Sequence, residues 1–299
     1  MVDNSFACRV GKGSFYGVKQ VALMMADISD NFTKDAWVYK GDIKGFFMSI
    51  NKNILWNKLE PLIREVFDCD YEWWSWLIKK IVMNRPELNC VIKGKKNDWE
   101  YIPQDKTLFK TNGKGIPIGN YTSQVFANLY LTAFDVMVLK KIGNDGRYGR
   151  GADDFVVMHK DKEFLKNFKK EIKEWLYVNL DLSLHSNKIY FQHINKGVKF
   201  LGSFIKNGIV YPSRRAIHNL KMVIREWNMR KTHTEKQVNK FLLRVNSYLG
   251  FLRQGKSYNL RKKLLKSINN KENWLINVNN LKIKKNKHYE KIYENHHSF

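Results

Sequence analysis

Cysteine and proline are scarce in this 299-residue sequence. It contains five prolines and three cysteines, Cys8, Cys69 and Cys90. The cysteines are odd in number, far apart and form no Cys-x-x-Cys pair, which argues against a disulfide framework and against a zinc site. Free thiols of this kind suit a reducing compartment.

Long apolar runs are also absent. No stretch approaches the roughly 18 apolar residues of a membrane helix. The first residues lack the basic-then-apolar pattern of a signal peptide. The sequence shows no internal repeat and no long linker rich in Pro, Gly or Ser. We therefore expect no membrane partner.

Acidic residues are few relative to basic ones. The chain has 28 Asp and Glu against 53 Lys and Arg, which gives a net charge of +25. Lysine and arginine release counterions when they neutralise phosphates, so this excess favours a nucleic-acid partner. A generally basic soluble surface and a patch for a membrane surface are the alternatives.

The apolar spacing predicts a mixed chain that becomes wholly helical toward its end. A long connection that contains a short hairpin is expected at 84–115, and an Asn207-Gly208 turn at a second hairpin. Trp73, Trp74 and Trp76 are expected to be core or helix contacts. The expected strands are 37–43, 180–184, 198–204 and 209–211, and the expected helices are 18–29, 54–66, 71–83, 120–142, 161–177, 213–231, 234–252 and 260–268.

Three carboxylates stand where predicted strands end. Asp42 closes one strand, and Asp153 and Asp154 lie between two short runs, as at a hairpin tip. An Asp-Asp pair alone is more often a solvated turn. With Asp42 added, the set can hold two Mg²⁺ ions about 3.5–4 Å apart, one at a primer 3′-hydroxyl and one at a nucleotide triphosphate.

Five segments resemble the polymerase motifs of reverse transcriptases, in the family's order. DIKGFFMSI resembles motif A, GIPIGNYTSQ motif B, GADDF motif C, LHSNKIYF motif D and VKFLGSFI motif E. The pattern Ile118-Gly119-x-x-x-Ser123-Gln124 is similar to the reverse transcriptases of diversity-generating retroelements, whereas group II intron and retron enzymes usually differ there. FACRVGKGSF and YGRGADDFVVMHKDKE fit the same subfamily.

This resemblance implies an α/β (α+β) right-hand polymerase. Residues 1–205 would form partial fingers and a palm with an antiparallel sheet, 206–270 a helical thumb, and 271–299 a basic tail. The family has a longer fingers region before the segment with which this sequence begins. The resemblance therefore implies a fragment, a misassigned start, or a minimal or defective enzyme.

The resemblance also implies roles for individual residues. Asp42 and Asp153 would bind metal, with Asp154 auxiliary and the backbone oxygen of Ile43 as a further ligand. Lys188 would stabilise the leaving pyrophosphate or act as general acid; a plain surface lysine is the alternative. Phe47 would be a steric gate against ribonucleotides. The residues expected to meet the nascent base pair and template are Ile118, Gly119, Ser123 and Gln124. Those expected at the primer end are Phe200, Leu201 and Gly202. The template backbone would contact Arg9 and Lys12.

The implied activity is RNA-directed DNA synthesis with two Mg²⁺ ions, for which Mn²⁺ can substitute. The enzyme would copy a template-repeat RNA into mutagenised cDNA in the cytoplasm of a bacterium, encoded there or by a phage. Its partners would be template RNA, a DNA primer and its cDNA, dNTPs, and a basic oligomeric accessory variability protein.

Several alternatives stay open. Within the class, they are a retron, group II-like or phage-defence reverse transcriptase. Outside it, the chain would be a catalytically impaired RNA-binding remnant, which is favoured by Gly151 in place of the family's aromatic ring. Loss of that ring would weaken primer positioning or loosen the hairpin. Retention of all three aspartates argues against a remnant, and a basic scaffold with an accidental Asp-Asp leaves the motif order unexplained.

Overall fold

The computed structural model describes residues 1–270, 273–278 and 281–286. The chain divides into two compact units, Met1–Leu201 and Gly202–Phe299. This boundary falls a few residues before the border expected at residue 206. Each unit contains its own hydrophobic core.

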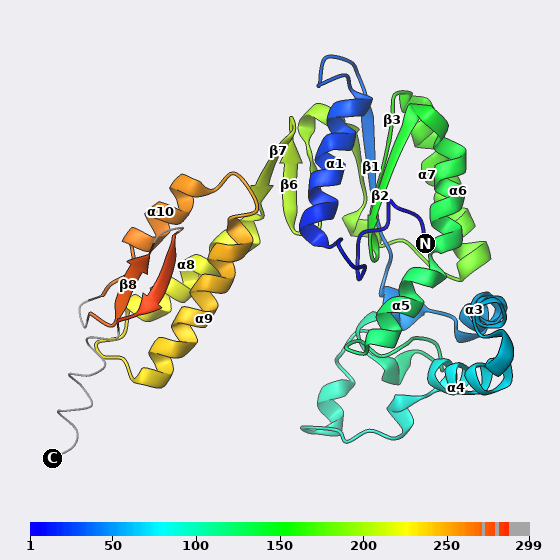
Figure 1. Cartoon of the computed structure of the whole chain (residues 1–299), viewed down its shortest axis with the longest axis horizontal. Coiled ribbons are helices and arrows are strands. Elements are labelled where there is room, and N and C mark those ends of the chain that lie inside the picture. Colours follow the sequence, from blue (N-terminus) through cyan, green and yellow to red (C-terminus); the bar gives the residue numbers. More distant parts are fainter. Residues whose placement is uncertain (271–272, 279–280, 287–299) are drawn as a thin grey trace. The chain divides into compact units, whose positions relative to one another are not determined.

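A four-stranded antiparallel sheet runs through the first unit (Figure 1). Its strands are β1 (Trp37–Asp42), β2 (Gly146–Gly151), β3 (Asp154–His159) and β4 (Tyr190–His193). They are ordered β2-β3-β1-β4, so strands distant in the sequence become neighbours. The register pairs Asp42 directly with Asp154. The predicted mixed fold with an antiparallel sheet is confirmed.

Helices cover both faces of this sheet. Helix α1 (Ser14–Ile28) packs on one face, and α6 (Thr132–Ile142) and α7 (Lys162–Leu180) lie on the other (Figure 1). Successive strand residues point to opposite faces. Tyr148 accordingly joins the core beneath α6 and α7, whereas a Cβ on its neighbour Gly149 would lie 3.1 Å from Val21 of α1.

Three helices follow β1: α2 (Phe46–Ser49), α3 (Lys52–Val66) and α4 (Tyr71–Met83). The last matches its predicted range. Trp74 packs against the core and stacks on Phe67, and Trp73 makes an edge contact with Trp74. Trp76 is 57% exposed and lines a surface hollow, so it lies outside the core.

The connection at 84–115 contains short 3₁₀ turns and no strand, although the structure describes its whole backbone. These turns are η2 (Pro86–Leu88), η3 (Lys96–Trp99), η4 (Gln104–Lys106) and η5 (Leu108–Lys110). The expected hairpin is therefore wrong.

The helix expected at 120–142 is two helices. Helix α5 (Tyr121–Tyr130) ends at Leu131, whose backbone leaves the regular α geometry (ψ −3°), and α6 follows directly. Leu131 is fully buried, so tertiary packing decides this break rather than helix propensity.

The strand expected at 180–184 is also wrong. Asp181 ends α7 in a left-handed conformation, with its N–H donated to Leu176 O and Tyr177 O. Leu184 forms an isolated bridge with Ile43, and β4 occupies the sheet edge instead. The alternating leucines reflect burial, since Leu180 and Leu182 belong to the core.

The second unit begins with the hairpin of β6 (Ser203–Lys206) and β7 (Ile209–Pro212), shortly after β5 (Val198–Phe200) of the first unit. Asn207 and Gly208 both have positive φ, as the predicted turn requires. Three helices follow, α8 (Arg214–Asn228), α9 (Glu235–Leu252) and α10 (Tyr258–Lys266). No helix in the described part of either unit is long and apolar enough to cross a membrane.

The described part of the expected basic tail is folded. Strands β8 (Leu275–Val278) and β9 (Lys282–Lys285) pair in an antiparallel hairpin. Trp274 and Ile283 join the core of the second unit, and Asn246 of α9 exchanges hydrogen bonds with the Ile283 backbone. A tail is therefore wrong for 275–278 and 282–285, while 271–272, 279–280 and 287–299 lie outside the described residues.

Gly41 in β1 is a sensitive packing position. A Cβ there would lie 2.2 Å from Cζ of the buried Phe155 ring. We expect Gly41→Ala to destabilise the protein by about 1–3 kcal/mol through overpacking. Chemical denaturation would measure this loss.

Gly250 provides the matched control. It lies within α9, and a Cβ there would meet nothing within 4 Å. Gly250→Ala should be neutral or stabilise the helix by up to about 1 kcal/mol. Equal effects of the two substitutions would contradict the steric explanation.

Candidate active site

The three predicted carboxylates gather at one end of the central sheet. Asp42 is the last residue of β1, and Asp154 is the first of β3, directly opposite. Asp153 lies with Ala152 in the two-residue loop between β2 and β3, and its carbonyl accepts a hydrogen bond from Ile43 N at 3.2 Å. The β1–β3 pairing thus brings together residues that lie 111 positions apart in the sequence.

A cavity of about 160 Å³ opens at this end of the sheet. It contains residues from four of the five sequence motifs. Six of the predicted site residues line it: Asp42, Ile43, Phe47, Ile118, Asp153 and Lys188. Phe47 comes from α2, and Ile118, which is 70% exposed, precedes α5. The structure therefore joins the predicted metal, gate and nucleotide residues in one space.

Asp154 is held differently from the other two acids. Its Oδ1 pairs with Lys40 Nζ at 2.8 Å, and its Oδ2 accepts a hydrogen bond from Leu201 N at 3.3 Å. Burial raises its pKa to about 6, although Lys40 acts in the opposite direction. Asp154 does not line the cavity, so its geometry suits an anchor for the sheet end.

Lys40 was missed by the sequence reasoning. Its signal was spacing: a residue two positions before Asp42 on the same strand shares its face of the sheet. The register with β3 then makes Lys40 a diagonal neighbour of Asp154.

Asp42 and Asp153 interact electrostatically. Burial raises the pKa of Asp153, and the nearby charge of Asp42 raises it further. Lys188 Nζ lies 3.0 Å from Asp42 Oδ2, and this bond raises the pKa of the Lys188 ammonium. The predicted lysine is therefore part of the site and carries its charge beside the carboxylate.

A divalent cation fits this donor set in part. Asp42 and Asp153 face one cavity together with Ile43, and two carboxylates with a backbone oxygen suit a hard cation. Over residues 1–270, 273–278 and 281–286, no group of three or more His, Cys, Asp or Glu side chains is arranged to hold a metal. The fit therefore rests on Asp42 and Asp153, with Asp154 turned to Lys40.

The remaining motif B residues do not line the cavity. Gly119 is a positive-φ turn (φ 109°) just before α5. Gln124 lies on α5, and Ser123 is buried in its first turn.

The predicted template residues Arg9 and Lys12 form contacts within the first unit. Both side chains pair with Asp3, Arg9 at 3.6 Å and Lys12 at 3.1 Å. Arg9 also donates to the carbonyl of Ser5 at 3.1 Å. Their charges therefore help to fold the N-terminal loop, outside the cavity.

The predicted primer-end residues lie where the first unit ends and the second begins. Phe200 is fully buried and makes an edge contact with Phe6. Leu201 has an unusual left-handed backbone (φ 44°), and Gly202 opens the second unit.

Gly151 has a steric explanation in this structure. A Cβ at this position would lie 2.4 Å from Cδ2 and 2.9 Å from Cγ of Leu201. The Leu201 side chain thus fills the space above Gly151, and its backbone N–H anchors Asp154. β2 and β3 pair along their whole length although the family's aromatic ring is missing at this position.

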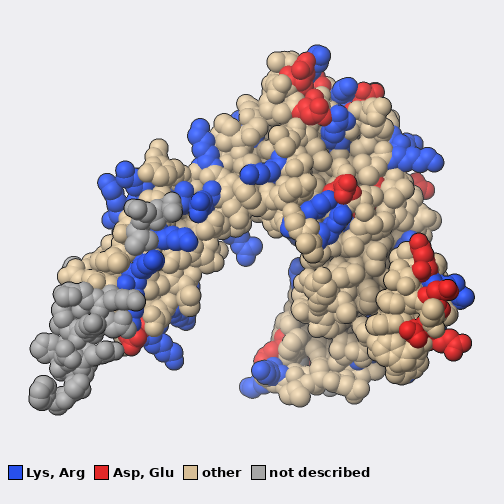
Figure 2. All heavy atoms as spheres, in the orientation of Figure 1, with Lys and Arg blue, Asp and Glu red and all other residues tan. Residues whose placement is uncertain are grey.

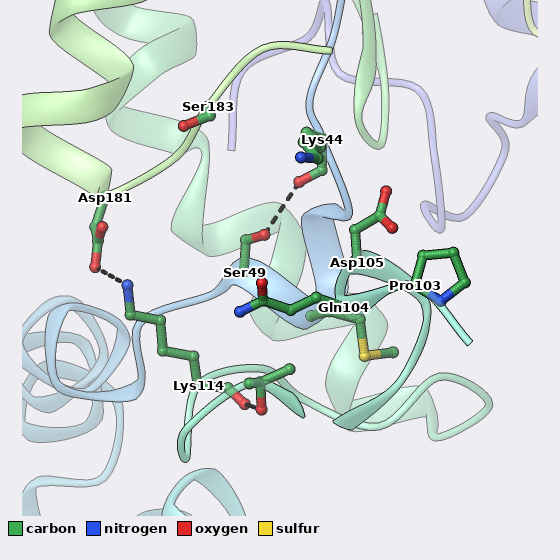
Figure 3. A pocket seen from close by; sticks show the side chains of 10 residues that line it. Lys44, Ser49, Pro103, Gln104, Asp105, Lys114, Asp181 and Ser183 are labelled. Atoms are coloured by element: carbon green, nitrogen blue, oxygen red, sulfur yellow. Dashed lines mark hydrogen bonds and ion pairs between the residues drawn. The ribbon is translucent and has the colours of Figure 1, made fainter. Parts of the chain in front are cut away.

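A second cavity, of about 370 Å³, adjoins the first (Figure 3). Met48 and Asp105 line both cavities. Lys114 pairs with Asp181 at 2.6 Å across this space, and Lys44 also lines it (Figure 3). Sequence reasoning missed these two lysines, although Lys44 stands inside DIKGFFMSI and Lys114 directly precedes GIPIG.

The antiparallel sheet and the carboxylates at its end are the features of a polymerase palm. Residues 3–205 match the family described as reverse transcriptase (RNA-dependent DNA polymerase). Because the match covers more than half of the sequence, the chain belongs to the reverse transcriptase family. The predicted reverse transcriptase family is thereby confirmed, and the predicted subtype stays a prediction.

Solved structures with a similar fold are telomerases. The chain is 12% identical to apo telomerase from Candida tropicalis, with a TM-score of 0.53, covering 88% of this chain and 44% of that chain. The chain is 13% identical to telomerase from Candida tropicalis in complex with a TWJ fragment of telomeric RNA, with a TM-score of 0.51. This match covers 88% of this chain and 47% of that chain. The chain thus spans less than half of these proteins, and the likeness concerns the fold. The comparison with curated proteins gave no match.

The two adjacent aspartates should differ in metal binding. Asp153→Asn removes a carboxylate that lines the cavity, so we expect it to abolish measurable Mn²⁺ binding. Asp154→Asn changes a group held by Lys40 and should weaken binding by about tenfold. Electron paramagnetic resonance of Mn²⁺ would measure both affinities.

Asp27→Asn is the control, because Asp27 is exposed and pairs with Arg147 at 2.6 Å. This variant should bind Mn²⁺ like the unmodified protein. Equal losses in the Asp153 and Asp154 variants would contradict the distinction between them.

Proposed function

We propose that this chain carries the catalytic site of an RNA-directed DNA polymerase that extends a DNA primer on an RNA template. The observation that carries the proposal is the shared cavity: Asp42 and Asp153 line it together with Phe47 and Lys188. Membership of the reverse transcriptase family supports the same activity.

In the proposed reaction, the primer 3′-oxygen forms a bond to the α-phosphorus of a dNTP. The bond from that phosphorus to the bridging oxygen breaks, pyrophosphate leaves, and the hydroxyl proton passes to solvent. Divalent cations held by Asp42, Asp153 and the Ile43 backbone oxygen, two of them in this proposal, would supply charge neutralisation at the triphosphate and the 3′-oxygen.

The chain's own residues then orient and select the substrate. The Lys188 ammonium lies beside Asp42, where it can stabilise charge on the leaving pyrophosphate. The Phe47 ring lines the cavity, and in this proposal it would clash with a ribose 2′-hydroxyl. Lys44 and Lys114 line the adjoining cavity, where they would meet phosphates of the substrate in this proposal.

The second unit supplies a basic surface for nucleic acid. Between Gly202 and Asn270 the sequence has sixteen Lys and Arg, and its only acidic residues are Glu226 and Glu235. Figure 2 shows basic side chains spread over the visible face of this unit. Such charge binds a phosphate backbone without regard to sequence. We propose that this unit acts as a helical thumb that holds the primer–template.

A finer proposal concerns the type of reverse transcriptase. The Ile118-Gly119-x-x-x-Ser123-Gln124 pattern favours a diversity-generating retroelement enzyme. Its template would be a template-repeat RNA, its product mutagenised cDNA, its partner a basic oligomeric accessory protein, and its location the bacterial cytoplasm. A template-repeat and variable-repeat pair beside the coding sequence would support this type, and a retron or group II element there would contradict it.

A non-catalytic RNA-binding protein is the competing proposal. It is favoured by the ion pair between Lys188 and Asp42 and by the lack of a three-residue metal group in the described residues. Against it, Asp42 and Asp153 are held side by side at a free energy cost that an idle site would not need.

Primer extension tests the proposed reaction. We expect the protein to extend a DNA primer on an RNA template with dNTPs and Mg²⁺, and Asp153→Ala to abolish extension because a metal-binding carboxylate is lost. The Asp27→Asn control should retain full activity. A folded protein that binds the RNA but extends no primer would favour the competing proposal.

Phe47→Ala tests the selection of the sugar. Removing the ring opens the cavity to a 2′-hydroxyl, so we expect the preference for dNTP over NTP to fall by about tenfold or more. Competition between dCTP and CTP on a guanine template would measure the ratio. An unchanged preference would show that another residue selects the sugar.

A further inference from the structure

A completely buried ion pair lies behind the loop of Ala152 and Asp153, which we call the acidic loop. Arg150 of β2 and Asp135 of α6 are both 0% exposed. Arg150 Nε donates to Asp135 Oδ1 and Arg150 Nη2 to Asp135 Oδ2, both at 2.6 Å. Removing two charges from water costs free energy, and this cost can exceed the gain from their attraction. A buried ion pair therefore does not by itself indicate a stabilising role.

The rest of the guanidinium reaches two other segments. Arg150 Nη1 donates to Ala152 O at 3.1 Å and to Asn128 Oδ1 at 3.2 Å. The Tyr148 hydroxyl completes the cluster by donating to Asp135 Oδ1 at 2.6 Å. The planar fork of arginine suits several fixed acceptors at once, which lysine cannot match.

The hydrogen bonds of Arg150 to Ala152 and Asn128 both involve segments of the proposed active site. Ala152 is the residue before Asp153, and it has a left-handed backbone (φ 60°) that a side chain disfavours. The bond to its carbonyl therefore holds the loop in the conformation that presents Asp153.

Asn128 connects the cluster to motif B. It belongs to α5, the helix that carries Ser123 and Gln124, and its side chain also donates to Ala7 O at 2.9 Å. The guanidinium of Arg150 thus forms hydrogen bonds both to α5 and to the acidic loop.

We infer that Arg150 is a positioning residue for the proposed polymerase reaction, with Asp135 as its counterion. Its role is to hold the loop of Asp153 in register with the helix that meets the nascent base pair. This inference rests on the proposed function. It explains why a charge is buried at this place, where an apolar side chain would fill the space at lower cost.

Two variants test the inference by different routes. Arg150→Lys keeps the charge beside Asp135 but loses the fork that reaches Ala152 and Asn128. The triple variant Arg150→Met, Asp135→Leu and Tyr148→Phe replaces the ion pair and the Tyr148 hydroxyl with apolar groups of similar size, which often preserves folding.

The readout is the single-turnover rate constant of primer extension, which does not depend on the fraction of active molecules. We expect both variants to lose about 10- to 100-fold in this constant, as for residues that orient an active-site ligand. The affinity for primer–template should stay unchanged.

The exposed pair of Lys141 and Glu171, at 2.9 Å, is the matched control, because it also involves α6. Lys141→Met with Glu171→Leu should leave the rate constant unaltered. If the unmodified protein extends no primer, the proposed function fails before this test begins.

With an active parent protein, the outcomes separate cleanly. A folded variant that extends primers at the unmodified rate constant would reject the inference. A loss of active fraction at an unchanged rate constant would show a purely structural role. Failure of both variants to fold would also show a purely structural role and would reject the inference.

Discussion

Like charges held close together set the main constraint on this structure. The β1–β3 register places Asp42 opposite Asp154, with Asp153 in the adjoining loop. Neighbouring carboxylates repel one another, and burial raises the pKa of both Asp153 and Asp154. Lysine ammonium groups offset this repulsion, Lys40 at Asp154 and Lys188 at Asp42. The site therefore combines carboxylates facing a cavity with a carboxylate that is neutralised inside the protein.

Support for these charges comes from residues that do not line the cavity. Leu201 fills the space above Gly151 and donates its backbone N–H to Asp154. Arg150 holds the loop from the other face of the sheet, through the carbonyl of Ala152. The acidic loop is thus fixed on both sides, one by packing and one by a buried charge. Gly151, which leaves space for Leu201, and the buried Arg150 thus both support the same loop.

Local sequence signals were reliable where one rule dominates. The Asn207-Gly208 turn, the helix Tyr71–Met83 and the strand before Asp42 all form as predicted. Tertiary packing overrode local signals elsewhere. The long helix after Gly119 breaks at the buried Leu131, and the alternating leucines after Tyr177 end a helix instead of forming a strand. The described part of the expected tail folds because Trp274 and Ile283 complete a core that starts far earlier in the sequence.

The sequence by itself determined the family, the order of the motifs and the acids that they carry, because these depend on residue identity and spacing. It also determined the excess positive charge. Only the tertiary structure decided that Asp154 faces Lys40 while Asp153 faces the cavity, and that Leu201 lies over Gly151. It alone decided that Arg150 reaches Asp135. These partners lie up to 114 residues apart. Their contacts follow from strand register and helix packing, which no local pattern encodes.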